Sequence, residues 1–284
     1  MPSTRQSLRN DLTKLGLEPG NIVMVHASVR SVGAIYSGPD EIHQAIVDVT
    51  APGGAMLMYV GCPNGYDEIG RGRLSAEEEA GLRANLPPFD PLATRADRSN
   101  GALAELFRSW PGTVVSANVG VRMAARGDRA DWLIAEHPLD FPHGRGTPFE
   151  KLVQTNGKVL LLGSSHDEVT LMHHAEEIAD FPDKIIATYE VPLLRDGVRV
   201  WVKCREVDSA GVAHESWPDE FFRLIVDDFI AKHDGTALCT HGLVGKSDSY
   251  VLDAAALTAH AVAIMEQTAK GRPYFDVPPA KGTA

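Results

Sequence analysis

Short apolar runs that alternate with amphipathic stretches constrain this chain more than any other feature of its sequence. Residues 21–26 (NIVMVH), 55–60 (AMLMYV) and 158–162 (KVLLL) each have the length and composition of a strand. Between the first two runs, Pro39 begins a stretch whose apolar residues recur at helical spacing. Strands that alternate with helices predict a sheet covered by helical layers.

The later part of the chain adds a hairpin to this pattern. Residues 184–194 and 198–207 are strand-like, and the turn sequence Arg195-Asp196-Gly197 joins them. We therefore expect an α/β fold with a mixed central β-sheet covered by helices and a late β-hairpin. Further elements are expected as short strands at 114–115 and 122–125, and as helices at 4–15, 75–85, 101–110, 129–136, 148–154, 168–179, 218–231 and 254–267.

Residues 61–100 form the longest segment without a clear period, apart from the helix expected within it. An irregular segment of this length inside a compact domain is more often functional than idle. No repeat or linker divides the 284 residues, so we expect a single domain over 1–284, with 1–2 and 272–284 as frayed ends.

The charge balance and the cysteines exclude several classes of protein. With 38 acidic and 27 basic residues the formal net charge is -11, which disfavours a nucleic-acid partner and permits a cationic small molecule, although such a charge can also serve solubility alone. The three cysteines share no short spacing, so neither a disulfide framework nor a cysteine zinc site is expected. Neither a signal peptide nor a membrane-spanning run is visible, which predicts a cytoplasmic protein without a membrane partner. The sequence does not distinguish a monomer from a homodimer.

The strongest local signal is the stretch from Gly163 to Ala179 (GSSHDEVTLMHHAEEIA). A strand ends here in a turn of small residues, which suits an anionic or carbonyl group, and a helix follows with Asp167 placed to cap it. His173 and Glu176 lie three residues apart and share one helix face. A carboxylate so placed can orient the imidazole and raise its basicity, as a general base for an amine requires. The alternative is an ordinary polar pair on a solvated helix.

His174 and Glu177 form a competing pair on a neighbouring face of the same helix. The apolar stripe that contains Met172 borders His173 and Glu176, so we expect His174 to face outward or to pack structurally. The sequence HHAEE lacks the HExxH and HxxEH orders of zinc enzymes, and no third ligand stands out. A metal site is therefore not expected.

Two weaker signals are a small-residue loop and a set of scattered acids. Residues 26–33 (HASVRSVG) follow a strand, and Arg30 there offers a phosphate partner, although neither a P-loop nor a GxGxxG motif is present. A plain strand-to-helix loop is the alternative. Each acid by itself is typical of a solvated surface charge, and spacing alone does not bring the acids together. The acids are Asp67, Glu68, Glu206 and Asp208.

An ordered series of motifs, from about residue 8 to residue 270, resembles the aminoglycoside 3-N-acetyltransferases, a family distinct from the GNAT-fold acetyltransferases. The matching pieces are, in order, VMVHASVRSVG, GPDEIHQAI, APGGAMLMY, FDP, GALAELFRSWPGTVVSA, MAARG, TPFEKLV, GKVLLLGSSHDEVTLMHHAEEIA and HGLVGKSDSYVLDA. The resemblance implies a mixed α/β sheet between helical layers. It also implies that acetyl-CoA, without a metal, acetylates the 3-amino group of a 2-deoxystreptamine aminoglycoside.

The resemblance also implies roles for individual residues. The family's histidine–glutamate pair falls on His173 and Glu176, and the acid at the start of that helix falls on Asp167. The residues implied for coenzyme binding are Ser28, Arg30, Ser31, Val32, Gly33, Ser164, Ser165 and Thr170. The antibiotic-facing acids, in loops of variable length, fall on Asp67, Glu206 and Asp208.

Two neighbouring positions depart from the family pattern. Family members commonly have His-Pro after the serine that matches Ser116, where this chain has Asn118 and Val119. The change puts the shape of that loop, and with it the substrate range, in question.

In the implied reaction His173 takes a proton from the attacking amine and Glu176 holds the imidazole ring. Backbone N–H groups near residues 31–33 would stabilise the thioester oxyanion. The alternatives are an acyltransferase of the same fold that acts on a different amine in biosynthesis, a drug-binding protein without catalysis, and a metallohydrolase.

Overall fold

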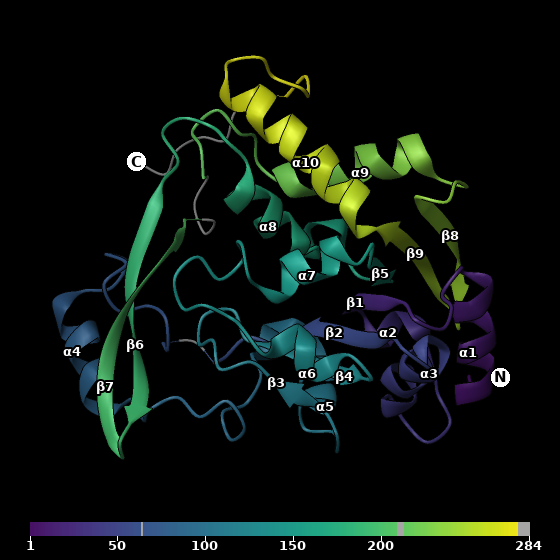
Figure 1. Ribbon diagram of the computed structural model, residues 1–284, viewed down its shortest axis with the longest axis horizontal. Helices are drawn as coiled ribbons and strands as arrows, with labels where there is room; N and C mark the ends of the chain where they lie inside the picture. Colours follow the sequence, from purple (N-terminus) through teal and green to yellow (C-terminus); the bar gives the residue numbers. More distant parts are fainter. Residues whose placement is uncertain (64, 209–212, 278–284) are drawn as a thin grey trace.

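A mixed seven-stranded sheet forms the centre of the protein (Figure 1). The computed structural model describes residues 1–63, 65–208 and 213–277. In the strand order β3-β4-β2-β1-β5-β9-β8, β1 pairs in parallel with β2 and β5, and the other pairs are antiparallel, which confirms the predicted mixed sheet. The strands are β1 (Ile22–Ala27), β2 (Ala55–Tyr59), β3 (Val114–Val115), β4 (Met123–Gly127), β5 (Lys158–Leu162), β8 (Cys239–Val244) and β9 (Ser247–Asp253).

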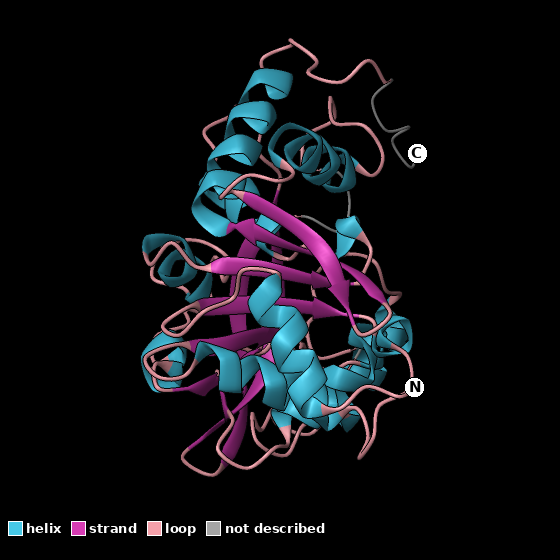
Figure 2. Ribbon diagram, turned by 90° about the vertical axis from the view of Figure 1, so that its right-hand side faces the viewer, coloured by secondary structure: helices cyan, strands magenta, loops and turns pink. Residues whose placement is uncertain are grey.

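Alternate residues of the central strands face two separate hydrophobic cores. Met24 and Leu161 pack into one core with α6 to α10, whereas Val25 and Leu160 pack into the other with α1, α3 and α5. Because both faces are covered, nearly every residue of these strands is apolar. Figure 2 shows the strands side by side, with helices lying over them.

Most helices agree closely with those expected from the sequence, whereas the helical turn at 29–32, where a loop was expected, and the 3-10 turns at 98–100 and 166–168 were not predicted. Within the described residues, none of them is long and apolar enough to cross a membrane. They are α1 (Arg5–Lys14), α2 (Val29–Val32), α3 (Asp40–Thr50), α4 (Ala76–Asn85), α5 (Gly101–Arg108), α6 (Ala130–Ile134), α7 (Pro148–Gln154), α8 (Leu171–Ile178), α9 (Phe221–His233) and α10 (Ala254–Ala269), with the 3-10 helices η1 (Arg98–Asn100) and η2 (His166–Glu168).

The predicted hairpin forms a separate two-stranded sheet from β6 (Ile186–Arg195) and β7 (Val198–Val207). Asp196 and Gly197 both have positive φ angles, 50° and 77°, as a tight two-residue turn requires. The hairpin runs along one side of the molecule beside α4 (Figure 1). A third hydrophobic cluster lies under the hairpin and is formed by Cys62, Tyr66, Phe89, Val119, Tyr189, Val191 and Cys204.

Strands β8 and β9 differ from the expectation, which placed no strand after residue 207. β8 lies at the edge of the sheet, and its burial alternates along the chain, with His241 and Leu243 exposed. An edge strand that exposes alternate residues to water has no continuous apolar run. Its sequence therefore resembles that of a loop.

Arg122 holds the irregular segment 61–100 against the sheet. Its side chain is fully buried. The guanidinium donates hydrogen bonds to four backbone carbonyls of the segment, those of Gly61 (2.8 Å), Pro91 (3.1 Å), Thr94 (2.7 Å) and Arg95 (2.7 Å). The segment follows β2 directly, so these bonds keep it close to the carboxyl end of that strand.

The expectation of a frayed end from residue 272 is corrected in part. The Tyr274 hydroxyl lies 3.1 Å from a carboxylate oxygen of Asp228, and the Phe275 ring packs edge-on against Phe221. Aromatic side chains hold these residues against α9, because their apolar surface is removed from water there. Residues 278–284 lie outside the described residues.

Candidate active site

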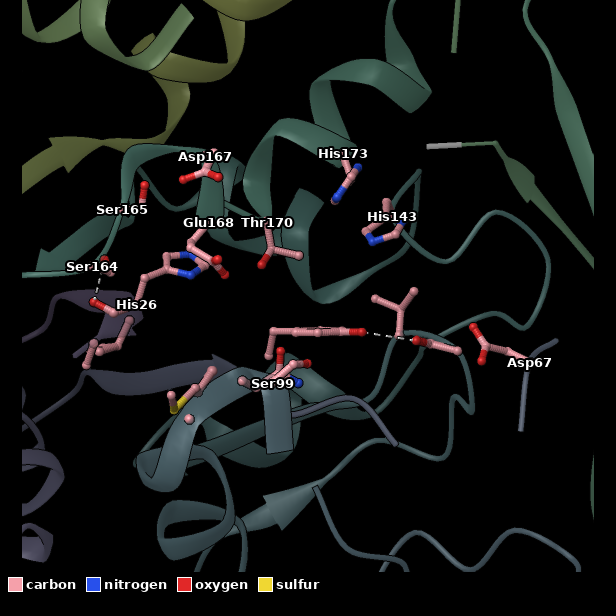
Figure 3. Close-up of a pocket in the computed structure, with 18 of the residues that line it drawn as sticks. His26, Asp67, Ser99, His143, Ser164, Ser165, Asp167, Glu168, Thr170 and His173 are labelled. Atoms are coloured by element: carbon pink, nitrogen blue, oxygen red, sulfur yellow. Dashed lines mark hydrogen bonds between the residues drawn. The ribbon is translucent and has the colours of Figure 1, made fainter. Parts of the chain in front are cut away.

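A cavity of about 760 Å³ lies where the carboxyl ends of β1 and β5 meet the start of α8 (Figure 3). In α/β sheets, ligands commonly bind beyond the carboxyl ends of parallel strands. Asp67, Arg71 and Ser99 from segment 61–100 line the cavity, together with Glu206 from the hairpin. The irregular segment and the hairpin therefore form walls of the cavity.

The turn that follows β5 is packed too tightly for any residue but glycine at position 163. Gly163 has a φ angle of 62°, and a Cβ atom there would lie 2.2 Å from Ser247 Oγ and 2.5 Å from Ser31 Cβ. The Ser31 hydroxyl donates to the Gly163 carbonyl at 3.2 Å, and the Ser164 hydroxyl donates to the His26 carbonyl at 3.2 Å. The two small-residue turns are thus joined, and they contribute Ser28, Ser164 and Ser165 to the cavity wall.

Four residues expected to bind coenzyme are not among those that line the cavity: Arg30, Ser31, Val32 and Gly33. Arg30 is exposed, and Val32 is fully buried. The backbone N–H groups of Ser31 and Gly33 donate to the carbonyls of Ser28 and Arg30. The N–H groups at both ends of the stretch 31–33, where oxyanion donors were expected, are thus already bonded within the turn.

Asp167 does not cap α8, contrary to expectation. The one-turn 3-10 helix η2 precedes α8, and Thr170 takes the N-cap position without a side-chain hydrogen bond. The chain leaves helical geometry at Val169, where ψ is 89°, so Asp167 lies one turn too early to reach the first N–H groups of α8. Asp167, Glu168 and Thr170 line the cavity instead.

His173 and Glu176 form the pair that their spacing predicts. Nδ1 of His173 lies 3.1 Å from Oε2 of Glu176. The His173 side chain is 26% exposed and lines the cavity, whereas that of Glu176 is 3% exposed. A carboxylate accepts a hydrogen bond and so holds the imidazole proton on Nδ1, which leaves the lone pair of Nε2 available. The arrangement can remove a proton from a group bound in the cavity.

His174 packs structurally, which was one of the two placements left open. It is buried, and its Nδ1 lies 2.5 Å from the backbone carbonyl of His143. Glu177 is also buried and accepts a hydrogen bond from the His143 N–H at 2.9 Å. Burial raises the pKa of Glu177 to about 8. This pair therefore anchors the loop that contains His143.

Arg71 contacts two of the acids, Asp67 and Glu206, whose positions in the sequence did not predict that they lie close together. Its guanidinium lies 2.6 Å from Oε1 of Glu206 and 3.4 Å from Oδ2 of Asp67. Burial raises the pKa of Asp67, and the charge of Arg71 opposes that rise. Asp208 is not among the lining residues. Its carboxylate pairs at 3.0 Å with the guanidinium of Arg73, and Arg73 does line the cavity. Asp208 therefore meets the cavity only through that guanidinium.

His26, Arg71 and His143 are among the wall residues to which the sequence assigned no role. His26 ends an apolar strand run directly before a small-residue loop, which is the one signal that could have identified it. Burial lowers its pKa to about 4, so the ring is neutral at pH 7. The other two lie in loops remote from both motifs, and no local pattern marks them.

Asn118 and Val119, the positions that depart from the family pattern, shape the turn before β4. The Asn118 amide donates to the Pro138 carbonyl at 2.6 Å, and its oxygen accepts from the Val121 N–H at 2.7 Å. Val119 is fully buried in the third hydrophobic cluster. Gly120, which directly follows Val119, lines the cavity. The departure therefore reaches the cavity through the backbone of this turn.

The cysteines do not form part of the cavity wall. Cys62, Cys204 and Cys239 are buried and unpaired, and none of the three lines the cavity. Burial raises the pKa of Cys204 to about 12 and that of Cys239 to about 11, so these thiols stay protonated and unreactive at pH 7. Among the described residues, no group of three or more histidine, cysteine, aspartate or glutamate side chains is placed to hold a metal ion.

Comparisons with known proteins connect this geometry to one family. The family model described as aminoglycoside 3-N-acetyltransferase matches residues 24–266. Aminoglycoside N(3)-acetyltransferase III of Pseudomonas aeruginosa is 40% identical over 266 residues, 94% of each chain. Aminoglycoside N(3)-acetyltransferase IX of Micromonospora chalcea is 38% identical over 89% of this chain and 90% of its own.

Solved structures show the same relationship. A binary complex of AAC-IIIb with CoASH matches with a TM-score of 0.87 at 39% identity, over 98% of this chain and 100% of that one. AAC-VIa bound to sisomicin matches with a TM-score of 0.85 at 32% identity, over 94% and 98% of the two chains. A shared fold over the whole domain, with sequence identity at this level, leaves one conclusion: the chain belongs to the aminoglycoside 3-N-acetyltransferase family.

Proposed function

We propose that this enzyme transfers the acetyl group of acetyl-CoA to the 3-amino group of the 2-deoxystreptamine ring of an aminoglycoside antibiotic, with His173 as the general base. The family name states this activity, and the related structures contain CoASH and sisomicin. The observation that supports the mechanism most is the 3.1 Å contact between His173 and the buried Glu176 at the cavity wall. Acetylation converts an ammonium group into a neutral amide and so confers resistance.

The chemistry assigned to the pair is a direct transfer. The amine lone pair forms a bond to the thioester carbonyl carbon, and Nε2 of His173 takes the proton that the nitrogen loses. The carbon–sulfur bond then breaks with its electron pair on sulfur, and the imidazolium returns the proton to give the CoA thiol. Glu176 orients the ring and stabilises its charged form. Holding both substrates in line supplies much of the remaining acceleration.

The joined turns after β1 and β5 fit the pantetheine and thioester part of acetyl-CoA. Small residues at Ser28, Gly163 and Ser164 let an extended ligand approach the backbone closely. We assign Ser165 and Thr170, which also line the cavity, to the same ligand. The exposed Arg30 is a partner for a phosphate group, while Ser31, Val32 and Gly33 support the shape of that loop.

The acidic wall fits a polycation. Five carboxylates line the cavity against the guanidinium groups of Arg71 and Arg73, so the wall carries net negative charge. We assign Asp67 and Glu206 to ammonium groups of the antibiotic, with Asp208 acting through Arg73. Asp167 contributes to the same potential from the other side. The five carboxylates are those of Asp67, Glu68, Asp167, Glu168 and Glu206.

Thiol release from acetyl-CoA tests the proposal. Purified enzyme should release CoA thiol only in the presence of an aminoglycoside, across a panel of gentamicin, tobramycin, kanamycin, neomycin and apramycin types. Mass spectrometry should show one added acetyl group, and NMR should place it on the 3-amino group. Silence across the panel together with turnover of another amine would favour a biosynthetic acyltransferase. Calorimetric binding of the antibiotics without any product would favour a drug-binding protein.

A further inference from the structure

The imidazole of His143 lies beside that of His173 at the cavity wall. Their ring centroids are 5.0 Å apart with the planes inclined by 42°, and both rings line the cavity. Figure 3 shows the two side chains from different segments on the same side of the cavity. A group bound close to the proposed base therefore meets His143 as well.

Helix α8 fixes the backbone of His143 from two sides. Nδ1 of His174 lies 2.5 Å from its carbonyl oxygen, and Oε2 of Glu177 accepts from its N–H at 2.9 Å. Because the same helix holds His173, these contacts place the backbone of His143 next to the segment that carries the other imidazole. The buried pair His174 and Glu177 thus places a second imidazole, that of His143, in the cavity wall.

The nitrogens of the His143 ring are not used by the fold. Within the described part of the chain, neither ring nitrogen makes a hydrogen bond, and Oε2 of Glu177 lies 3.8 Å from Nδ1. Burial, together with the neighbouring His173, lowers the pKa of His143 well below its ordinary value. The ring is therefore a neutral imidazole that offers a lone pair to a donor in the cavity.

We propose that His143 accepts a hydrogen bond from an ammonium or hydroxyl group of the acceptor substrate, next to the reacting amine, and so helps to select polyamine acceptors. The inference rests on the proposed function. A neutral imidazole suits this task, since it attracts a cationic donor without adding a positive charge beside His173. A ring that only packed against His173 would influence turnover and not the affinity for the acceptor.

Two substitutions at position 143 separate these roles. His143→Phe keeps a ring against His173 but removes the acceptor atoms, and His143→Gln keeps an acceptor. We expect His143→Phe to weaken gentamicin binding to the CoA-bound enzyme by about ten- to a hundredfold in calorimetry, as loss of a hydrogen bond to a charged group does. His143→Gln should recover most of that affinity. The affinity for CoA should not change.

Phe222→Leu is the matched control. The Phe222 ring lies 4.9 Å from that of His173 and is not among the residues that line the cavity. We expect Phe222→Leu to lower kcat and to leave gentamicin affinity as in the parent. His143→Phe should instead lower the affinity for gentamicin. Equal gentamicin affinity in His143→Phe and the parent overturns the proposal, as does a loss of kcat alone.

A measurement on the parent protein covers the case in which His143→Phe fails to fold. Gentamicin added to enzyme with ¹⁵N-labelled histidine should shift the ring-nitrogen resonances of His143, assigned through the His143→Gln spectrum. Unshifted resonances at saturating gentamicin contradict the proposal. Turnover of the parent decides the proposed function separately, because both binding measurements remain informative even if no acetyl group is transferred.

Discussion

Oε2 of Glu176 lies 3.1 Å from Nδ1 of His173, and the Glu176 side chain is almost completely shielded from water while the imidazole faces the cavity. Water does not compete with the ring for this carboxylate, so the contact orients the imidazole more firmly than an exposed pair would. The spacing of three residues on α8 creates the contact. The packing of the helix against the sheet decides which of the two groups reaches the cavity.

The first prediction concerns this pair. His173→Ala should lower kcat by about 10²–10⁴, the usual effect of removing a general base, with little change in substrate affinity. Glu176→Gln should lose less, because the imidazole remains. His241→Ala, at an exposed position of β8, is the control and should turn over like the parent. Steady-state kinetics check all three, and near-parent kcat in a folded His173→Ala enzyme would remove His173 from the mechanism.

The second prediction compares two acids. Asp67→Asn should raise the KM for the antibiotic about two- to fivefold, since Asp67 lines the cavity and partly exposed ion pairs contribute modestly. Asp208→Asn should change it less, because Asp208 faces Arg73 and not the cavity. The KM for acetyl-CoA should stay constant in both, and the affinity for the antibiotic should fall as salt is added. Identical antibiotic KM values for Asp67→Asn and the parent would show that this acid does not meet the substrate.

The third prediction concerns the stability of the cavity wall. Arg122→Met should lower the free energy of unfolding by about 3–5 kcal/mol, because it leaves the four carbonyls of segment 61–100 without their buried donor. Urea denaturation measures the loss. Arg98→Met, at an exposed position of η1, is the control and should stay close to the parent. Equal midpoints for the two variants would mean that other contacts hold the segment.

The fourth prediction concerns pH. Burial raises the pKa of Glu177 from 4.5 to about 8, so between these values the folded protein keeps a proton that the unfolded chain has lost. The free energy of unfolding should therefore fall with rising pH by roughly 1.4 kcal/mol per unit in that window. Burial lowers the pKa of His26 and of His137 to about 4. Below pH 6.5 these rings take up protons in the unfolded chain before they do so in the folded protein, so their contribution to the free energy of unfolding rises with pH and opposes that of Glu177. Stability should be greatest near pH 6.5.

Glu177→Gln tests the alkaline side of this profile. An amide cannot titrate, so denaturation curves from pH 6.5 to pH 8 should be flatter for this variant than for the parent. Glu77→Gln, on the exposed first turn of α4, should keep the parent slope. A parent profile that does not fall between pH 6.5 and pH 8 contradicts the raised pKa of Glu177.

Local patterns in the sequence were sufficient to predict most of the helices and strands and one contact in the site, that between His173 and Glu176. The strand 158–162 and the helix 148–154 have the predicted bounds, because period and end signals act within a few residues. The contact between His173 and Glu176 follows from helix geometry alone, since residues three apart share a face. Capping by Asp167 could not be predicted correctly, because the extra turn η2 depends on how these residues pack against α9.

The rest of the cavity was decided by tertiary structure. Arg71 and Glu206 are 135 positions apart in the chain, and they meet because the hairpin packs against segment 61–100. His143 reaches His173 because α8 binds the backbone of a loop about 30 residues earlier. The sequence by itself determined what its short-range periods and turn residues encode, namely most of the strands and helices and the contact between His173 and Glu176. Only the packed fold decided which distant side chains share the cavity, because burial of the three hydrophobic clusters and not any local signal brings those segments together.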